Sequence, residues 1–347
     1  MRSGSLENDY QNRINNEIKH YNSLYGTEEA KKELKYDTPL IWKEVEKSVS
    51  RKIHEKTGRE GFVGYCAGFS ERKKPLKILS IGAGPCGLEL NHIMPKLPKG
   101  SSLTAFDLNE EVLKMAQGKA SATGIKFNYL VQDANEMSLP ESEFDLITCY
   151  ASLHHFIELG RIAWEINKAL KPDGEFVTVD ICSRNGYLLW EENKRLVGSL
   201  FSTLPEQYRL NYYTKKTDSV FQDKDYSLNS FECINSEAII PALGKHLETK
   251  HLIPMTAISR RFFDHMYGYN FDLGRKFDRA FVEMVLALDD LSISSGKLKP
   301  ETFFGAYTKK SGIGEKPPMG QFKIAGSPSL FSRALRRING LYGKKTK

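Results

Sequence analysis

The chain has 347 residues, a net charge of +7 at neutral pH and a hydrophobic fraction of 40%. This length is enough for one elaborated domain or for two domains with a sizeable core. The sequence has no apolar run long enough to cross a bilayer, and its N-terminus lacks the apolar segment of a signal peptide, so we expect an intracellular, cytoplasmic protein.

The basic charge is concentrated near the C-terminus. Residues 327–347 contain six basic and no acidic residues, which leaves the other 326 residues near +1. The body of the chain therefore has no general attraction to a phosphate backbone, and we predict no nucleic-acid partner. The five cysteines are scattered, odd in number and never spaced as C-x-x-C. This pattern indicates free thiols and argues against a disulfide framework or a zinc site.

Residues 1–74 are predicted to form a helical N-terminal cap. Apolar residues recur there at helical spacing, at Tyr10, Ile14, Ile18 and Tyr21. A second amphipathic helix is expected to begin at Pro39, and the glycine-rich stretch 58–68 is expected to be a loop before the first strand. Two interpretations stay open: the cap packs over the edge of a bound ligand, or it only covers a sheet.

A glycine-rich turn follows the first predicted strand, residues 77–81. Residues 82–87, GAGPCG, have the spacing G-x-G-x-x-G. Glycine lets the backbone turn sharply out of the strand and approach a ligand without clashes from a Cβ, and the helix expected from Leu88 then points its N-terminus at that ligand. Because the same turn serves NAD, FAD and S-adenosylmethionine, the spacing alone does not identify the ligand.

Two acidic residues follow the next two predicted strands. Asp107 ends the strand 102–107, twenty residues beyond Gly87, where a carboxylate can accept hydrogen bonds from a ribose diol. Asp133 follows the strand 127–131, where it could accept from the exocyclic amine of an adenine while the next backbone N–H meets a ring nitrogen. For each aspartate the alternative is the cap of a helix.

Residues 144–150 and 175–180 are predicted as the fourth and fifth strands, separated by a helix over 157–170 and a turn at 171–174, KPDG. Alternating strands and helices indicate a parallel sheet with right-handed crossovers and a ligand crevice at the carboxyl ends of the strands. The polar residues expected along this edge are Asp107, Asp133, Tyr150, His154 and Asp180.

Four segments between residues 75 and 181 together resemble the class I S-adenosylmethionine-dependent methyltransferases: the GAGPCG turn, the strand ending in Asp107, residues 132–156 (QDANEMSLPESEFDLITCYASLHHF) and the LKPDGEF turn. The resemblance implies an α/β fold, with a Rossmann-like, mostly parallel sheet of seven strands, helices on both faces and an antiparallel last strand. Residues 247–252 and 302–307 are expected to be strands six and seven. The implied cofactor is S-adenosylmethionine, and the residues predicted to bind it are Gly82, Ala83, Gly84, Gly87, Asp107, Leu108, Asp133, Ala134, Tyr150 and Ala151.

Two insertions depart from the minimal pattern of that family: residues 182–246, and residues 256–300 within the segment 247–310 that holds the last two strands. We assign both to a lid over the methyl acceptor, because aromatic residues mixed with Arg and His suit stacking on a sugar or flat ring. The residues predicted to bind the acceptor are Tyr187, Trp190, Arg209, Arg260 and Tyr267. The alternative is that these aromatics form a small core of the lid itself. Residues 188–210 and 230–234 also resemble methyltransferases of bacterial polysaccharide and glycosylation pathways.

Methyl transfer requires an acceptor atom held in line with the methyl group and shielded from water. A base would help a hydroxyl acceptor, and His154 and His155, directly after the fourth strand, are the predicted bases, with His265 of the lid as the second candidate. Alternatively, the paired histidines shape the cofactor pocket or cap the next helix. The sequence has no ligand set with metal spacing, so no metal is predicted, although Asp180 beside an acceptor diol could join a magnesium site.

These patterns predict an S-adenosylmethionine-dependent O-methyltransferase that acts on a sugar hydroxyl of a glycan or of a glycosylated or lipid-linked intermediate. The alternatives are a methyltransferase of a small natural product, lipid or amine, a non-catalytic methyltransferase-like binding module, and a nicotinamide-dependent dehydrogenase. The linker and tail, residues 311–347, carry a basic amphipathic pattern between Leu330 and Tyr342. We expect this pattern to lie on the inner face of a membrane, or to dock on the protein's own body or on a partner enzyme.

Overall fold

The structure is a computed structural model that describes residues 3–25 and 38–320. The basic amphipathic pattern between Leu330 and Tyr342, and with it the predicted membrane or partner contact, lies outside the described residues. Among the helices of the described ranges, none has the length and apolar character needed to span a bilayer.

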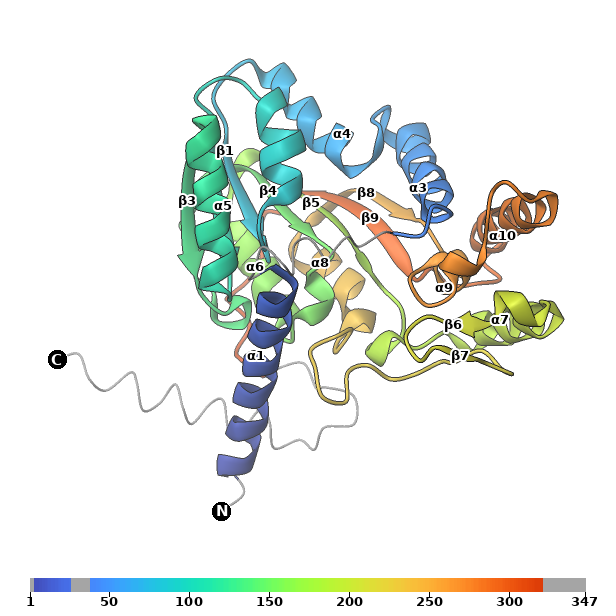
Figure 1. Cartoon of the computed structure of the whole chain (residues 1–347). Coiled ribbons are helices and arrows are strands. Elements are labelled where there is room, and N and C mark those ends of the chain that lie inside the picture. Colours follow the sequence, from blue (N-terminus) through green and yellow to red (C-terminus); the bar gives the residue numbers. More distant parts are fainter. Residues whose placement is uncertain (1–2, 26–37, 321–347) are drawn as a thin grey trace.

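Seven of the strands in the described part of the chain form one sheet at the centre of the molecule (Figure 1). They are β1 (Lys77–Ile81), β2 (Ser102–Asp107), β3 (Lys126–Val131), β4 (Phe144–Tyr150), β5 (Leu170–Ile181), β8 (Glu248–Pro254) and β9 (Thr302–Thr308). Their order is β3-β2-β1-β4-β5-β9-β8. The pairs among β1 to β5 are parallel, whereas β9 runs antiparallel to both of its neighbours. The predicted α/β fold, including the antiparallel last strand, is confirmed.

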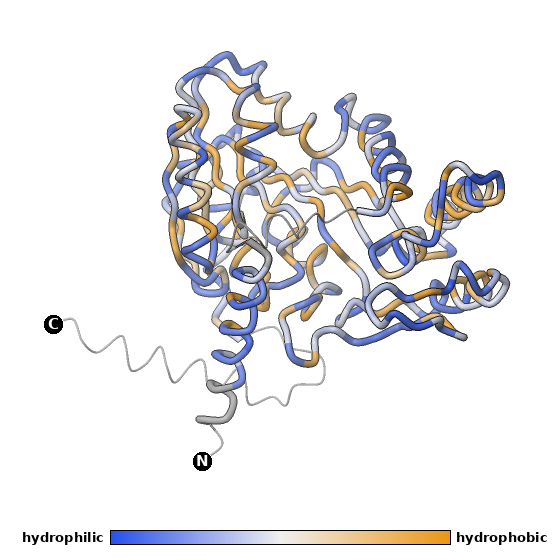
Figure 2. Tube along the Cα trace, in the orientation of Figure 1, coloured by the Kyte–Doolittle hydropathy of each residue, from blue (hydrophilic) through white to orange (hydrophobic). Residues whose placement is uncertain are grey.

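Helices cover both faces of this sheet, because successive residues of the central strands point to opposite sides. On one face, Ile78 and Leu146 pack with α3 (Trp42–Thr57), α4 (Gly61–Ala67) and α5 (Glu110–Thr123). On the other face, Leu79 and Ile147 pack with α6 (Leu159–Ala169) and α8 (Ile239–His246). Figure 2 shows the hydrophobic residues along the strands and on the helix sides that face them, whereas α1 (Ser3–Tyr25) is mainly hydrophilic.

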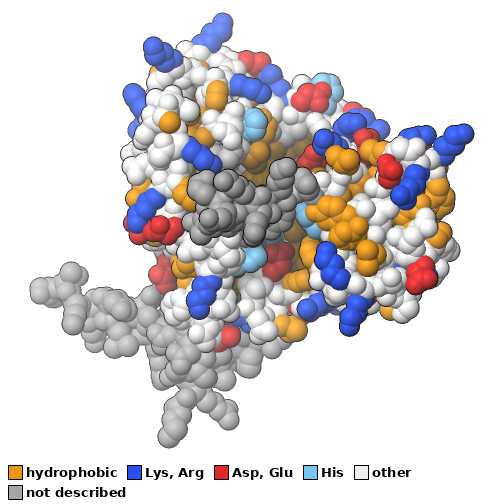
Figure 3. All heavy atoms as spheres, viewed as in Figure 1, with side chains coloured by type: hydrophobic (Ala, Val, Ile, Leu, Met, Phe, Trp, Pro, Cys, Tyr) orange, Lys and Arg blue, Asp and Glu red, His pale blue; other side chains and the backbone are white. Residues whose placement is uncertain are grey.

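Most of the two insertions forms a separate unit to the right of the sheet in Figure 1, called the lid below, whereas α8 at the end of the first insertion packs on the sheet. The lid contains α7 (Glu191–Thr203), α9 (Ser259–Phe263), α10 (Lys276–Ser294) and a small ribbon of β6 (Leu210–Asn211) and β7 (Lys216–Thr217). It has its own core, whose aromatic members include Phe201, Tyr208, Phe262, Phe263, Tyr267 and Phe281. Most lid aromatics therefore pack within the lid, in agreement with the alternative interpretation that they form a small core of the lid itself. Further hydrophobic side chains are exposed on the lid at the right of Figure 3.

A buried ion pair fastens the lid to the sheet. The Nε and Nη2 atoms of Arg261 on α9 each lie 2.8 Å from a carboxylate oxygen of Glu301, which directly precedes β9. This fork geometry is bidentate, and the guanidinium also donates to the carbonyl oxygen of Tyr187. Arg261 is thus held between the lid and the sheet edge, beside the site described below.

Residues 171–174 do not form the predicted turn, because strand β5 already begins at Leu170. The extra length is absorbed by a register shift: Phe144 of β4 lies opposite Leu170, but Leu146 lies opposite Glu175. At this irregularity a Cβ on Gly174 would come within 2.8 Å of the carbonyl oxygen of Phe144. A glycine in a bulge and a glycine in a turn leave the same sequence pattern, which explains the wrong prediction.

Candidate active site

A cavity of about 280 Å³ opens at the carboxyl ends of β1 to β4. One side is the glycine turn, in which Gly82 and Gly84 have φ angles of 63° and 49°. These values lie in the left-handed region that favours glycine. A Cβ on Gly82 would also lie 2.6 Å from the Cβ of Ser152, which follows β4. The turn can therefore pack against Ser152 only because Gly82 has no side chain.

Replacing Gly82 with alanine should lower the free energy of unfolding by about 1–3 kcal/mol, because alanine is strained at this φ and collides with Ser152. Urea unfolding measures the change. Gly118→Ala is the matched control, since that glycine lies in α5 with open space around its Cβ position. An equal, small effect of both substitutions would contradict the packing described for the turn.

Asp107 joins the glycine turn to the end of β2. One carboxylate oxygen accepts from the backbone N–H of Gly84 at 2.8 Å and the other from that of Asn109 at 2.9 Å. The cap of α5 is instead Asn109, whose side chain accepts from the N–H of Glu111. Burial raises the pKa of the Asp107 carboxyl, although the backbone N–H groups act against that shift. The helix-cap interpretation of Asp107 is therefore wrong, and its carboxylate lies in the cavity lining.

Asp133, just after β3, accepts hydrogen bonds through both of its carboxylate oxygens. One oxygen accepts from the N–H of Asn135 at 2.8 Å and caps the short 3₁₀ helix Ala134–Glu136. The other accepts from the hydroxyl of Tyr10 on α1. The capping interpretation thus holds for Asp133, and the residue also lines the cavity.

Helix α1 covers the cavity, so the N-terminal cap does pack over the edge of this site (Figure 1). Arg13 donates from Nη1 to the carbonyl oxygen of Ser227 at 2.7 Å, and Tyr10 packs edge-on against Phe231. On the other side Asn109 donates to Asn22 at 2.8 Å. The helix is thereby fastened to the first insertion and to the sheet edge. The residues it contributes to the lining are Tyr10, Ile14, Glu17, Ile18 and Tyr21.

Nine of the ten predicted cofactor residues lie on the lining of this cavity, and Gly87 does not. The other lining residues from outside α1 were not predicted to bind the cofactor, although His155 was predicted as a base or as a residue that shapes this pocket; they include Phe106, Asn109, Val112, Gln132, Asn135, Ser152, His155, Phe156 and Phe231. Phe106, Asn109, Gln132 and Ser152 lie within two residues of a predicted strand end, so these four could have been found by extending each prediction slightly.

A second cavity, of about 550 Å³, lies between α1, the end of β4 and the lid. It shares Glu17, Tyr21 and His155 with the first cavity. The remaining lining residues are Asn16, His20, Tyr187, Tyr213, Phe221, Gln222, Tyr226, Ser230, Glu232, Arg261, Asp264 and Met266. We name the first space the cofactor cavity and the second the acceptor cavity.

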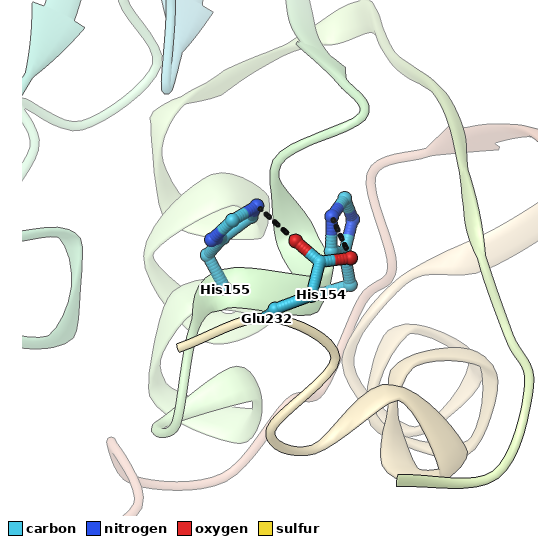
Figure 4. A group of neighbouring side chains, drawn as sticks. All are labelled: His154, His155 and Glu232. Atoms are coloured by element: carbon cyan, nitrogen blue, oxygen red, sulfur yellow. Dashed lines mark ion pairs between the residues drawn. The ribbon is translucent and has the colours of Figure 1, made fainter. Parts of the chain in front are cut away.

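His154, His155 and Glu232 form a cluster at the junction of the two cavities (Figure 4). The Nδ1 atom of His154 lies 2.6 Å from Asp180, and the Nδ1 atom of His155 lies 2.8 Å from Glu17. Their Nε2 atoms lie 3.7 and 3.5 Å from the two oxygens of Glu232. The cluster therefore connects the end of β4, the end of β5, α1 and the first insertion.

The charges of this cluster stabilise one another. Burial opposes protonation of His155, but the contact with Glu17 and the charges of Glu232 and Asp180 outweigh burial and raise the pKa to about 9. Burial would raise the pKa of Glu232, but the two histidines more than offset it, so that the pKa is lowered. His155 therefore carries a proton on both ring nitrogens at neutral pH in this state. A role as general base would require that proton to leave first.

The predicted catalytic and acceptor residues are distributed unevenly. His155 and Tyr187 line the acceptor cavity, whereas His154 is buried directly behind it. Four other predicted residues lie outside both linings: His265, Trp190, Arg209 and Arg260. Tyr267 requires a correction, because it is fully buried in the lid core and donates to Asp218. Its spacing among aromatics reflects packing and not contact with an acceptor.

Several acceptor-cavity residues were not singled out from the sequence, notably Glu17, Tyr226, Glu232, Arg261 and Asp264. Arg261 lines the cavity where Arg260 had been predicted, because on a short helix only one of two adjacent residues points inward. Burial raises the pKa of the Asp264 carboxyl to about 6, against backbone N–H groups and both arginines. The cavity wall thus holds both acidic and basic groups.

The order of the strands and the cavity at their carboxyl ends are those of a nucleotide-cofactor fold. Residues 79–178 match the family model of a methyltransferase domain. This match and the sheet confirm, for the matched domain, the predicted methyltransferase with S-adenosylmethionine as its cofactor.

Individual relatives resemble only part of the chain. An uncharacterized methyltransferase, YcgJ, of Bacillus subtilis is 29% identical over 105 residues, which cover 30% of this chain and 40% of the relative. A demethylmenaquinone methyltransferase of Thermus thermophilus is 26% identical over 108 residues, covering 31% and 48%. The chain thus spans less than half the length of these relatives. The crystal structure of a geranyl diphosphate C-methyltransferase from Streptomyces coelicolor is 14% identical, with a TM-score of 0.41 over 70% of this chain and 78% of that one.

Proposed function

We propose that this chain transfers the methyl group of S-adenosylmethionine to a hydroxyl oxygen of a polar acceptor, namely a sugar in a glycan or in a glycosylated or lipid-linked intermediate. The observation that supports this most strongly is the junction of the two cavities. His155 lines both, so a methyl group in the cofactor cavity can face an acceptor across this residue. Direct access between donor and acceptor is what an in-line transfer requires.

The residues of the cofactor cavity suit an adenosyl group. The glycine turn leaves room beside β1, Asp107 offers a carboxylate for a ribose diol, and Asp133 offers one for the adenine amine. The bound cofactor supplies an electrophilic methyl group, so the protein itself needs to provide little chemistry beyond orientation. Helix α1 covers this site and would exclude water from it.

The lining of the acceptor cavity favours a hydroxylated acceptor. Most of its side chains carry a hydroxyl, amide, imidazole or charged group, and the tyrosine rings also offer flat surfaces for a sugar ring. Tyr187 is braced by Arg260, whose Nε donates to its hydroxyl at 3.2 Å, and its ring stacks on the guanidinium of Arg261 at 3.9 Å. Rigid polar walls of this kind hold an acceptor through several hydrogen bonds at once.

A quinol is the second candidate acceptor, because two of the relatives are named as methyltransferases of demethylmenaquinone and of a polyprenyl benzoquinol. The matched segment nevertheless says little about the acceptor. Of the described residues that line the acceptor cavity, only His155 lies within residues 79–178.

Transfer of a radiolabelled methyl group from S-adenosylmethionine tests the proposal. The full chain is incubated with panels of sugar nucleotides and lipid-linked sugars, and in parallel with menaquinol precursors. We expect label in the sugar panel, with the methyl group on oxygen by mass spectrometry and NMR. Label only in the quinols would overturn the sugar assignment, and binding of the cofactor without transfer to any acceptor would support a non-catalytic module.

Replacing Tyr226 with phenylalanine should raise the KM for the acceptor about 3- to 10-fold, since one neutral hydrogen bond contributes about 0.5–1.5 kcal/mol. We expect kcat and the affinity for S-adenosylmethionine to stay unchanged, because Tyr226 lines the acceptor cavity alone. Steady-state kinetics with Tyr129→Phe as the control, on β3 away from both linings, measure the difference. Equal KM values for the two variants would remove this hydroxyl from acceptor binding.

A further inference from the structure

We propose that His154, His155 and Glu232 bind one divalent transition-metal ion in the wall of the acceptor cavity. The three side chains come from two segments that lie far apart in the sequence, the 3₁₀ helix Leu153–His155 after β4 and the loop before α8. Figure 4 shows the Glu232 carboxylate between the two imidazole rings. One possible ligand atom from each residue lies within 4.8 Å of those of the other two.

The distances in the cluster suit a shared ion better than direct hydrogen bonds. The Nε2 atoms of His154 and His155 lie 3.7 and 3.5 Å from the carboxylate oxygens of Glu232. A hydrogen bond between such groups would be about 2.9 Å long. Two ligands of one tetrahedral ion, each bound at about 2.0–2.1 Å, lie roughly 3.3 Å apart. Small movements of Glu232, which is partly exposed, together with release of the Nε2 proton of His155, would therefore let the three groups coordinate one ion.

A carboxylate lies beside the other nitrogen of each imidazole, and for His154 it forms the hydrogen bond that metal-binding histidines usually have. Asp180 lies 2.6 Å from Nδ1 of His154, and Glu17 lies 2.8 Å from Nδ1 of His155. Because an ionised carboxylate can only accept, the Nδ1 atom of His154 carries a proton, whereas the contact of His155 with Glu17 is an ion pair without hydrogen-bond geometry. This places the remaining nitrogen, Nε2, toward Glu232 in both rings. A carboxylate behind each ligating histidine is a common arrangement that fixes the ring and raises its basicity.

Asp180 is itself rigidly placed. Its second oxygen accepts from the backbone N–H groups of Ser152 and Leu153, at 2.9 and 2.7 Å, and its first from that of Ile181 at 2.7 Å. These bonds lock the carboxylate against the start of the 3₁₀ helix that carries both histidines. The His154 ring is therefore oriented before any ion arrives, which reduces the cost of binding.

The donor set indicates which ions the cluster would accept. Two imidazole nitrogens and one carboxylate oxygen suit Zn²⁺, Co²⁺, Mn²⁺ or Fe²⁺, whereas Mg²⁺ and Ca²⁺ prefer oxygen ligands. Three protein ligands leave at least one coordination position open, as in catalytic metal sites. Glu232 and His155 both line the acceptor cavity, so the open position would face the acceptor.

The role of the ion rests on the proposed function, whereas its binding does not. An acceptor hydroxyl on the open position would have a lowered pKa and would be fixed beside the methyl group. On transfer, the O–H proton passes to solvent water, the new C–O bond forms, and the C–S bond breaks with its electron pair remaining on sulfur. The product is S-adenosylhomocysteine, and the ion undergoes no redox change.

Binding of Co²⁺ to the full chain, stripped of metal with a chelator, tests the site without any acceptor. Calorimetry should give one bound ion per chain, and visible d–d absorption should report nitrogen and oxygen ligands. Glu232→Gln should weaken Co²⁺ binding at least about 10-fold, because loss of an outer carboxylate already costs 10- to 100-fold. His155→Gln should have a similar effect. His92→Ala, an exposed histidine outside the cluster, is the control and should bind Co²⁺ like the unaltered chain.

Absence of Co²⁺ and Zn²⁺ binding by a folded chain would overturn the metal site and leave the cluster as an ion-pair network. Binding that survives both Glu232→Gln and His155→Gln would likewise overturn it, because the ion would then lie elsewhere. Calorimetry with S-adenosylmethionine on the same Glu232→Gln sample shows whether the fold is intact, since Glu232 lies outside the cofactor cavity. Failure of the metal site is thus distinguishable from failure of the methyltransferase proposal.

Discussion

Replacing Asp107 with asparagine is expected to weaken the binding of S-adenosylmethionine at least about 100-fold. The carboxylate lies in the cofactor cavity at the end of β2 and is held by the N–H groups of Gly84 and Asn109. It remains able to accept two charge-assisted hydrogen bonds from a ribose diol, each contributing about 1.5–3 kcal/mol. Loss of about 3 kcal/mol corresponds to about a 100-fold rise in Kd. Isothermal titration calorimetry measures this Kd directly.

The control for this experiment is Asp173→Asn, which removes an exposed carboxylate from β5 that pairs with Arg72. We expect its Kd to match that of the unaltered chain. Because Asp107 also supports the glycine turn, thermal unfolding of the apo variant is recorded alongside. A folded Asp107→Asn protein with a Kd within about threefold of the control, under 0.7 kcal/mol, would show that no ribose diol lies on this carboxylate.

Replacing His155 with alanine should lower kcat about 100-fold or more, whereas the Kd for S-adenosylmethionine should change less than about threefold. Loss of a group that handles or positions a reacting proton typically costs 10²- to 10⁴-fold. His155 lies where the two cavities meet, and its loss also leaves Glu17 and Glu232 without a common partner. Single-turnover kinetics at saturating cofactor separate the chemical step from binding.

His92→Ala serves again as the control, with unchanged kcat expected because that side chain is exposed outside both cavities. His155→Gln adds a second comparison, since glutamine can hold an acceptor through a hydrogen bond but cannot take up a proton. Full turnover in His155→Ala would contradict a role for this residue in the transfer. If His155→Ala weakened cofactor binding by the same factor as it lowered turnover, His155 would act in the cofactor site alone.

Local patterns in the sequence were sufficient to predict the sheet and the cofactor cavity. Short apolar runs ending in Asp107, Asp133 and Tyr150 identified strands, and parallel strands bring their carboxyl ends to one edge whatever the details of the helices. Nine of ten predicted cofactor residues lie on the cofactor cavity for this reason. A local pattern is sufficient where the fold itself brings the residues together.

The helix that covers the cofactor cavity and the lining of the acceptor cavity depend on contacts that no local pattern encodes. The hydrogen bond from Tyr10 to Asp133 joins residues 123 positions apart, and helical spacing in α1 showed only that one face is buried. Aromatic composition likewise did not separate Tyr226, which lines the cavity, from Tyr267, which lies in the lid core. Tyrosine occurs both in cores and in binding sites, so only the packing decides between these two roles.

The same limit applies to the histidine cluster. His154 and His155 were singled out because they follow β4, but no third ligand with metal spacing accompanies them in the sequence. Glu232 comes from a loop without regular structure, and Glu17 from the helix that covers the site. Ligands assembled from distant segments give no spacing signal, so the sequence predicted only bases here, and the metal site is proposed from the structure alone.

A crystal structure with bound S-adenosylhomocysteine will show whether the cofactor cavity places a methyl donor against the acceptor cavity. We expect the adenine near Asp133, the ribose hydroxyls on Asp107, and the sulfur beside His155, facing the space between α1 and the lid. A sulfur atom that points away from that space, or an adenosyl group bound outside the cavity, would contradict the account.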